Sequence, residues 1–244
     1  MSSTSPIVLY DIPTKGPQHC WSWNNWKTRF LLNFKGLDYV TEWTEYPDIK
    51  PTFEKYFPDE TYFTCPTIRL ADGETYIMDS KKIAARLEAD YPTPAIHLEL
   101  KSPLFEQLIQ NLRVAMTPLQ PVYIYLVLTR LLSDKSTPFF STTRTEDIGM
   151  SVEQYHQECD VEAAWEESGK GFSGVTAMLK ASGGPFLRGQ TVSYDDFICA
   201  GVLLFFKSLG DDVFVKLVKV SGDDGEAIKG LLEAVEPWSK RDSY

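Results

Sequence analysis

Residues 65–80 read CPTIRLADGETYIMDS and carry the strongest signals for the fold. The run Cys65–Leu70 favours a strand, and Thr75–Met78 favours a second strand that returns beside it. The dipeptide Asp72-Gly73 between them is typical of a tight turn, so the two strands are predicted to form a hairpin. A helix with one apolar face is predicted to follow and to run to about Asp90.

The segments before this hairpin alternate between strand and helix signals. Residues 7–12 form a short apolar run closed by a proline, which is typical of a buried strand. After a loop, aromatic residues recur every four positions from Trp26, which indicates a helix that starts after Ser22 and ends near Gly36. Residues 38–46 alternate like a strand, and the prolines beyond them leave room for one short helix. The first ninety residues are therefore predicted to have the order β-α-β-α-β-β-α.

The sequence changes character after a proline-containing linker at residues 91–94. The remainder shows helical spacing and no convincing strand signal. Helices are predicted from Ser102-Pro103 onward and over residues 122–132, 152–179, 194–209 and 226–235, while residues 135–149 receive no assignment. The predicted architecture is an α/β domain over residues 1–94 followed by an all-helical domain over residues 95–244.

The composition excludes several classes of function. The 244 residues carry a net charge of −10, so the chain lacks the basic surface that binds nucleic acid or an anionic membrane. The longest strongly apolar run, residues 197–206, is too short to span a bilayer. The cysteines are far apart, form no CxxC pair and give no metal-ligand spacing with the histidines. Because the first residues also lack the features of a secretory signal, we expect a metal-free cytoplasmic protein.

Several motifs occur where the cytosolic glutathione transferases have them, and the chain resembles that family over nearly its whole length. Cys65-Pro66 precedes the third predicted strand, where the family has its cis-proline, and Asp79-Ser80 opens the third helix. The segment Ser193–Asp196, which follows Phe186–Gly189, resembles the family's capping box. The resemblance implies a thioredoxin-like domain that binds glutathione, an all-helical second domain and a homodimer.

Residues 21–29, WSWNNWKTR, indicate a subclass. They resemble the Ser-x-x-x-Trp-Lys/Arg segment of the β-etherase-like transferases, and residues 45–49 resemble the fungal relatives of that class. This serine-type class binds glutathione and aromatic ligands. The β-etherases have a proline after the serine, whereas this chain has Trp23. The resemblance therefore supports glutathione binding more strongly than ether cleavage.

The resemblance also implies that Ser22 donates a hydrogen bond to the sulfur of glutathione. The thiolate is the reactive form of a thiol, and a hydroxyl donor beside a helix N-terminus stabilises it. Asn24, in preference to Asn25, would supply a second donor. The alternative for Ser22 is a purely structural N-cap. Cys20 is a rival nucleophile that would make the protein a thiol transferase, unless it is a buried, inert thiol.

The other contacts to glutathione are implied by the same resemblance. A cis-proline at Pro66 would turn the backbone of Cys65 toward the cysteinyl part of glutathione. Asp79 and Ser80 would bind the γ-glutamyl group at a helix N-terminus. The glycyl carboxylate needs a cation, and the two candidates, which could equally be surface lysines, are Lys35 and Lys50.

The second substrate is expected to bind between the domains. Trp21, Trp23 and Tyr123 would offer aromatic surface there, unless these side chains only pack the domain interface. The predicted function is a glutathione transferase that uses glutathione as co-substrate and acts on hydrophobic aromatic or electrophilic compounds, with peroxidase or ether-cleaving side activity as an option. The alternative is a ligandin-like protein that binds aromatic or polyphenolic molecules with little catalysis.

Overall fold

The structure, a computed structural model, describes residues 5–244 of the chain. The first four residues, which were included in the predicted domain over residues 1–94 and in the search for a secretory signal, lie outside the described residues. The N-terminal domain follows the predicted order of strands and helices. Its elements are β1 (Ile7–Asp11), α1 (Trp23–Phe34), β2 (Tyr39–Trp43), α2 (Tyr46–Phe53), β3 (Thr67–Arg69), β4 (Tyr76–Met78) and α3 (Ser80–Asp90).

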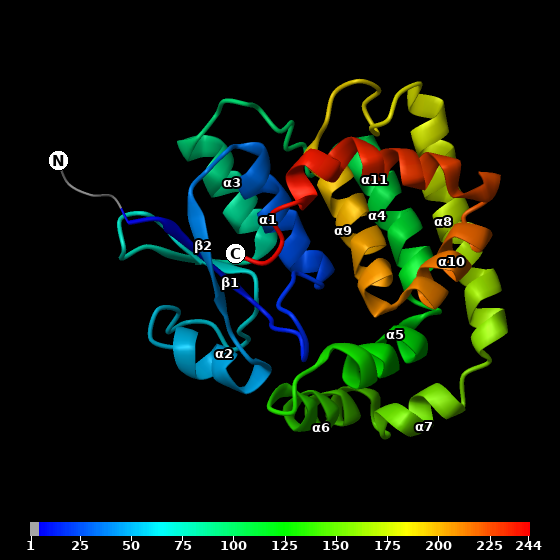
Figure 1. Cartoon of the computed structure of the whole chain (residues 1–244), viewed down its shortest axis with the longest axis horizontal. Coiled ribbons are helices and arrows are strands. Elements are labelled where there is room, and N and C mark those ends of the chain that lie inside the picture. Colours follow the sequence, from blue (N-terminus) through cyan, green and yellow to red (C-terminus); the bar gives the residue numbers. More distant parts are fainter. Residues whose placement is uncertain (1–4) are drawn as a thin grey trace.

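The four strands form one mixed sheet in the order β2-β1-β3-β4. Strand β1 pairs parallel with β2, from Ile7 opposite Tyr39 to Asp11 opposite Trp43, and antiparallel with β3. Strands β3 and β4 form the predicted hairpin. All of β1 is buried, since α1 and α3 lie on one side of the sheet and α2 on the other (Figure 1). The predicted thioredoxin-like fold is confirmed.

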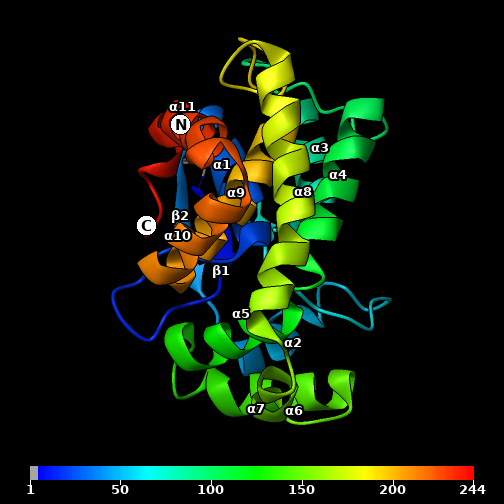
Figure 2. The same ribbon diagram turned by 90° about the vertical axis from the view of Figure 1, so that its right-hand side faces the viewer.

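The rest of the described chain is helical, which confirms the second half of the predicted fold class. Its elements are α4 (Pro103–Met116), α5 (Gln120–Leu126), the π-helical η1 (Val127–Leu131), α6 (Ser136–Ile148), α7 (Val152–Gln157), α8 (Val161–Ser182), α9 (Tyr194–Leu209), α10 (Asp211–Val220), the 3-10 turn η2 (Asp223–Gly225) and α11 (Glu226–Ser239). Helix α8 runs along the height of the domain, with α6 and α7 below it (Figure 2). Within residues 5–244, no helix is long and apolar enough to cross a membrane. The domain boundary at residue 94 stays a prediction.

The structure corrects the sequence analysis at three places in the helical domain. The single helix predicted over residues 152–179 is two helices, because the side chains of Ser151 and Asp160 cap α7 and α8 separately. Residues 135–149, left without assignment, contain α6, in which only two of 13 residues are buried. Helix α10 was also missed. In α6 the apolar periodicity that identifies a helix is nearly absent.

Helix α9 joins the two domains. Its Phe197 ring stacks on Phe30 of α1, with ring centroids 5.1 Å apart and an interplanar angle of 10°. Further along, Gly201 faces the first turn of α1, where an added Cβ would lie 3.0 Å from the carbonyl oxygen of Trp23. The start of α1 is therefore fixed against the helical domain as well as against the sheet.

The predicted capping box at the start of α9 is confirmed. The Asp196 carboxylate accepts the N–H and the hydroxyl of Ser193, both at 2.8 Å, and the N–H of Leu187 at 2.7 Å. Its neighbour Asp195 is buried beside it, with the Nη2 of Arg188 3.6 Å from Oδ2. Burial raises the pKa of Asp195 to about 6, although Arg188 lowers it.

We expect the Asp195→Asn variant to lose a pH dependence of stability that the wild-type chain has. The folded chain binds the Asp195 proton more tightly than the unfolded chain, whose aspartate pKa is about 3.9. The contribution of this group to the free energy of unfolding therefore falls as the pH rises from about 4 to about 6. Urea titrations at pH 4.5 and 7 should show a difference between wild type and variant that changes by about 1–2 kcal/mol.

The matched control for this experiment is Asp212→Asn. Asp212 is exposed, and its hydrogen bond to Arg130 lowers its pKa. The contribution of Asp212 to the free energy of unfolding is therefore lost only as the pH falls below the ordinary pKa of an aspartate, about 3.9. This loss lies outside the interval between pH 4.5 and pH 7 in which the titrations are made. If the wild type and Asp195→Asn have parallel pH profiles, Asp195 does not titrate in the way its burial predicts.

Candidate functional site

The loop between β1 and α1 places Ser22 at the N-terminus of α1. The carbonyl oxygen of Ser22 accepts the N–H of Trp26 at 3.0 Å, so Ser22 is the predicted N-cap. Its side chain makes no capping hydrogen bond, and the first turn of α1 holds no acidic residue. The half-buried hydroxyl can therefore donate to a ligand beside the positive end of the helix. The alternative, in which the Ser22 side chain serves only to cap α1, is therefore not supported.

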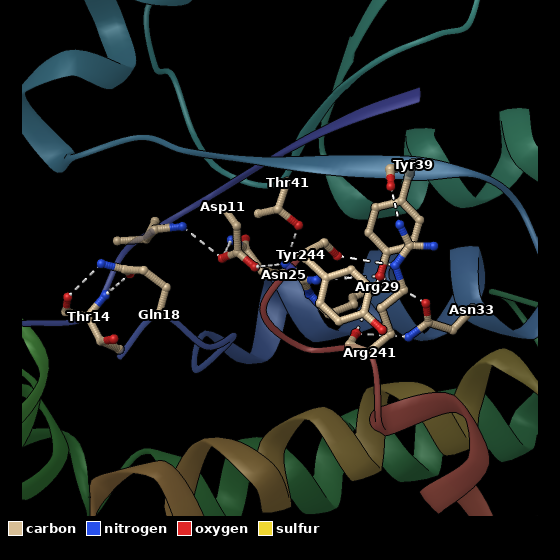
Figure 3. Close-up of polar contacts among 11 residues, drawn as sticks. Asp11, Thr14, Gln18, Asn25, Arg29, Asn33, Tyr39, Thr41, Arg241 and Tyr244 are labelled. Atoms are coloured by element: carbon tan, nitrogen blue, oxygen red, sulfur yellow. Dashed lines mark hydrogen bonds and ion pairs between the residues drawn. The ribbon is translucent and has the colours of Figure 1, made fainter. Parts of the chain in front are cut away.

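The two neighbouring asparagines have different surroundings. Asn25 is buried, and its amide nitrogen donates to the carboxylate of Asp11 at the end of β1 (Figure 3). Asn24 is half-buried, and its Oδ1 accepts the ammonium of Lys27 at 2.7 Å. Within residues 5–244 the amide nitrogen of Asn24 has no protein partner, so Asn24 rather than Asn25 is available as a second donor beside Ser22.

Lys27 is a further candidate residue of the functional site, and the sequence analysis gave it no role. Burial and the nearby ammonium of Lys81 lower the pKa of Lys27 to about 8, while Asp79 raises it. Lys81 and Asp79 lie at the start of α3, so the ammonium of Lys27 on α1 is close enough to the start of α3 for these charges to act on it. The basic position that closes the Ser-x-x-x-Trp-Lys/Arg segment was the signal for it.

The Cys65–Pro66 peptide bond is cis, as the resemblance implied. Cys65 is buried, and it precedes the strand ladder, which begins at Thr67 opposite Tyr10. In the part of the chain that the structure describes, the backbone N–H and C=O of Cys65 have no hydrogen-bond partner. Their predicted partner, the cysteinyl backbone of glutathione, remains a prediction.

Asp79 and Ser80 form the start of α3. Asp79 has φ +83°, a conformation that a residue with a side chain rarely adopts, and its Oδ1 accepts the N–H groups of Lys81 and Lys82 at 2.9 and 3.0 Å. Ser80 is buried, and its carbonyl oxygen accepts the hydroxyl of Tyr194 at 3.1 Å. The capping role of Asp79 is thus present, and the binding of a γ-glutamyl group by this pair stays a prediction.

The two lysines proposed for the glycyl carboxylate differ in availability. Lys35 is buried, and its ammonium donates to the carbonyl oxygens of Tyr91 and Pro94 and pairs with Glu88 at 2.7 Å. These three partners use its three protons, so Lys35 holds the end of α3 and is not free to bind a ligand. Lys50 is exposed on α2 and remains the candidate of the pair.

The rival nucleophile Cys20 has unsuitable surroundings. It is 1% exposed, and burial together with the carboxylate of Asp11 raises the pKa of its thiol well above the ordinary value. A thiol that is neutral and covered cannot serve as a thiolate nucleophile. Cys199 is buried, as expected for a core residue, whereas Cys159 is only partly buried.

The three candidate aromatic residues differ in how far their side chains are exposed. Trp23 is half-buried and meets Phe205 of α9 edge to face, with ring centroids 4.6 Å apart. Tyr123 of α5 is also half-buried and packs against both rings, 5.7 Å from each. Trp21 is 3% exposed, so it has the packing role that the sequence left as its alternative and offers no surface to a ligand. Trp23 and Tyr123 remain as candidates for a second-substrate site.

Comparisons with known families and structures identify the family of the chain. Residues 21–90 match the family described as "Glutathione S-transferase, N-terminal domain", and residues 102–238 match "Glutathione S-transferase, C-terminal domain". The chain is 28% identical over 222 residues to the glutathione S-transferase-like protein ustS of Aspergillus flavus, an alignment covering 80% of this chain and 78% of that protein.

Solved structures of fungal proteins match nearly the whole chain. The glutathione transferase GSTFuA3 of Phanerochaete chrysosporium has 26% identity and a TM-score of 0.82, covering 97% of this chain and 98% of that one. The glutathione S-transferase CsGST63524 of Ceriporiopsis subvermispora, solved in complex with glutathione, has 31% identity and a TM-score of 0.83, covering 96% of this chain and 98% of that one.

Proposed function

Because the chain belongs to the glutathione S-transferase family, we propose that it binds glutathione as the thiolate and transfers it to hydrophobic aromatic or electrophilic compounds. The observation that carries this proposal is Ser22, which lies at the start of α1 with a hydroxyl that does not cap the helix. Asn24 offers a second donor close by, on the same helical turn. Both residues belong to the first turn of α1, at the positive end of this helix.

The proposed reaction is a nucleophilic displacement or addition at an electrophilic carbon. The thiol proton leaves to solvent, and a sulfur lone pair forms the new S–C bond. In a displacement, the bond to the leaving group breaks and its electron pair departs with that group. In an addition, the π bond at the electrophilic carbon breaks, its electron pair moves onto the acceptor, and the acceptor takes a proton from solvent. Ser22 and Asn24 would donate hydrogen bonds to the sulfur, which lowers its pKa without any covalent bond to the protein.

The rest of the tripeptide would bind along the edge formed by β3 and α3. Cys65, held before the cis-proline Pro66, would pair its backbone with the cysteinyl part. Asp79 and Ser80 would bind the γ-glutamyl group at the start of α3. Lys50 would bind the glycyl carboxylate. The free backbone of Cys65 and the strained conformation of Asp79 support this arrangement.

We further propose that the protein belongs to the serine-type, etherase-like fungal class. Its match to two fungal transferases over nearly their whole length supports a fungal relationship. The aromatic pair Trp23 and Tyr123 supports an apolar, planar second substrate. The same pair also favours the alternative function, a ligandin-like carrier, for which polyphenols would quench Trp23 fluorescence while conjugation rates stay negligible.

Calorimetric titration of reduced glutathione into the protein tests the proposed function. We expect binding by the wild type and an affinity at least about tenfold lower in Ser80→Ala, because a hydrogen bond to a charged group contributes about 1.5–3 kcal/mol. The control is Ser102→Ala, since Ser102 caps α4 through the N–H of Phe105 outside the site. The absence of binding at millimolar glutathione would refute the proposal.

A further inference from the structure

The last residues of the chain leave the helical domain and lie on the N-terminal domain. After α11, residues 240–244 run beside α1 and β2 (Figure 1). The amide nitrogen of Asn33 on α1 donates to the carbonyl oxygens of Trp238 and Arg241, at 2.7 and 3.1 Å. The backbone N–H of Cys20 donates to the carbonyl oxygen of Asp242 at 2.8 Å. We refer to residues 241–244 as the strap.

Arg241 anchors the strap to β2. Its guanidinium donates to the carbonyl oxygen of Tyr39 and lies over the Tyr39 ring, 3.8 Å from the centroid (Figure 3). The Tyr39 hydroxyl donates to the Oδ1 of Asn33 at 2.8 Å, so the residue that holds the strap from β2 is bonded to the one that holds it from α1. Tyr39 and Asn33 therefore form a continuous seat for Arg241.

This seat is hydrogen-bonded to a buried polar network, formed by Arg29 and Asp11, next to the loop that carries Ser22. The guanidinium of Arg29 donates to the Tyr39 hydroxyl at 3.4 Å and to the carboxylate of Asp11 at 2.9 Å. Asp11 in turn accepts the N–H of Ile12, the first residue of the loop, at 2.7 Å. The strap thus contacts the β1–α1 loop directly at Cys20 and, through Tyr39 and Arg29, at its beginning.

The other anchors of this loop lie farther from Ser22 along the chain. Thr14 and Gln18 bond to each other within the loop, and the backbone N–H of Lys15 donates to the carbonyl oxygen of Leu131 at 2.8 Å. Cys20 is two residues before Ser22, and two residues span at most about 7 Å. The strap is therefore the last hydrogen-bonded support of the loop before Ser22.

From these contacts we propose that the strap positions Ser22 in the glutathione site, with Arg241 as its positioning residue. This inference rests on the proposed function, in which Ser22 donates to the glutathione sulfur. In this proposal Arg241 has no role in binding either substrate. It acts by holding Asp242 against Cys20, which keeps the Ser22 hydroxyl in the geometry that stabilises the thiolate.

The test compares Arg241→Ala, Arg241→Lys and Lys240→Ala. Lysine keeps a cation over the Tyr39 ring but loses the planar guanidinium, so its effect should be intermediate. Lys240 is the matched control, because within residues 5–244 its ammonium pairs only with Glu236 on α11. Three quantities are measured: hydrogen exchange of residues 14–22, the pKa of bound glutathione from thiolate absorbance, and kcat with KM.

In Arg241→Ala we expect the Cys20 amide to exchange at least about tenfold faster. The pKa of the bound thiol should rise by about half a unit to one unit, and kcat should fall about tenfold with a smaller change in KM. A role in stability alone would change neither the thiol pKa nor kcat of the folded protein. Lys240→Ala should match the wild type in all three measurements.

Two negative results remain distinguishable. A wild type that does not bind glutathione contradicts the proposed function, and the inference that depends on it fails as well. A wild type that conjugates glutathione, together with an Arg241→Ala variant that has the same thiol pKa and kcat, overturns the positioning role alone. Deletion of residues 241–244, compared with deletion of residues 243–244, repeats the test without a side-chain substitution, because the shorter deletion keeps Arg241 and Asp242.

Discussion

The Ser22→Ala variant is expected to lose about a hundredfold in kcat/KM for conjugation of glutathione. In the proposed site the hydroxyl of Ser22, which makes no capping hydrogen bond, donates to the sulfur, and removing one donor to a developing or full negative charge typically costs this much. The pKa of bound glutathione should rise by one to two units, since each unit corresponds to about 1.4 kcal/mol. Thiolate absorbance as a function of pH, alongside steady-state kinetics, measures both effects.

The stability of the same variant separates the two interpretations of Ser22. An N-cap whose side chain bonds to the helix contributes about 1 kcal/mol. Because the Ser22 side chain makes no such bond, the free energy of unfolding should change by less than about 0.5 kcal/mol. Ser22→Thr keeps a hydroxyl and serves as the conservative control. Full turnover by Ser22→Ala, with a loss of stability instead, would return Ser22 to a structural role.

The sequence predicted those parts of the fold in which a local pattern indicates only one kind of secondary structure. The apolar run of β1 and the Asp72-Gly73 turn both indicate structure without reference to the rest of the chain. Helix α6 escaped prediction because tertiary contacts support it: Tyr46 on α2 packs on Phe140, and the carboxylate of Glu45 accepts the hydroxyl of Ser136, the first residue of α6. These contact partners are distant in sequence, so the local apolar periodicity of residues 136–148 does not predict them.

The candidate site shows the same division. The family resemblance, and not position alone, implied the roles of Ser22, Asp79 and Ser80 toward glutathione, and these roles stay predictions. The sequence analysis preferred Asn24 to Asn25, but the physical reason is visible only in the structure, where the amide of Asn25 donates to Asp11. Lys35 was taken for a possible ligand or surface lysine, whereas its three partners are carbonyl oxygens and a carboxylate contributed by the end of α3 and the loop after it.

The ion pair between Arg29 and Asp11 was also missed, and it underlies the second large prediction. Both side chains are 0% exposed, with 2.9 Å between Nη2 and Oδ2. An arginine on a helix is ordinarily a surface residue, so nothing in the sequence indicated that Arg29 faces the sheet. Its partner Asp11 also holds Ile12 and Asn25, which means that the pair supports both ends of the β1–α1 loop.

We expect Arg29→Met to destabilise the protein by about 3–5 kcal/mol, because it leaves the Asp11 carboxylate buried without its counter-charge. Urea unfolding measures this loss. The matched control is Arg86→Met, which removes a partly exposed arginine paired with Asp90 at 2.7 Å and should cost less than about 1 kcal/mol. The double variant Asp11→Ala, Arg29→Met should be more stable than Arg29→Met alone, since it contains no unpaired buried charge. A loss below about 1 kcal/mol in Arg29→Met would show that water or rearrangement compensates Asp11, and the network could then not transmit the position of the strap to the loop that carries Ser22.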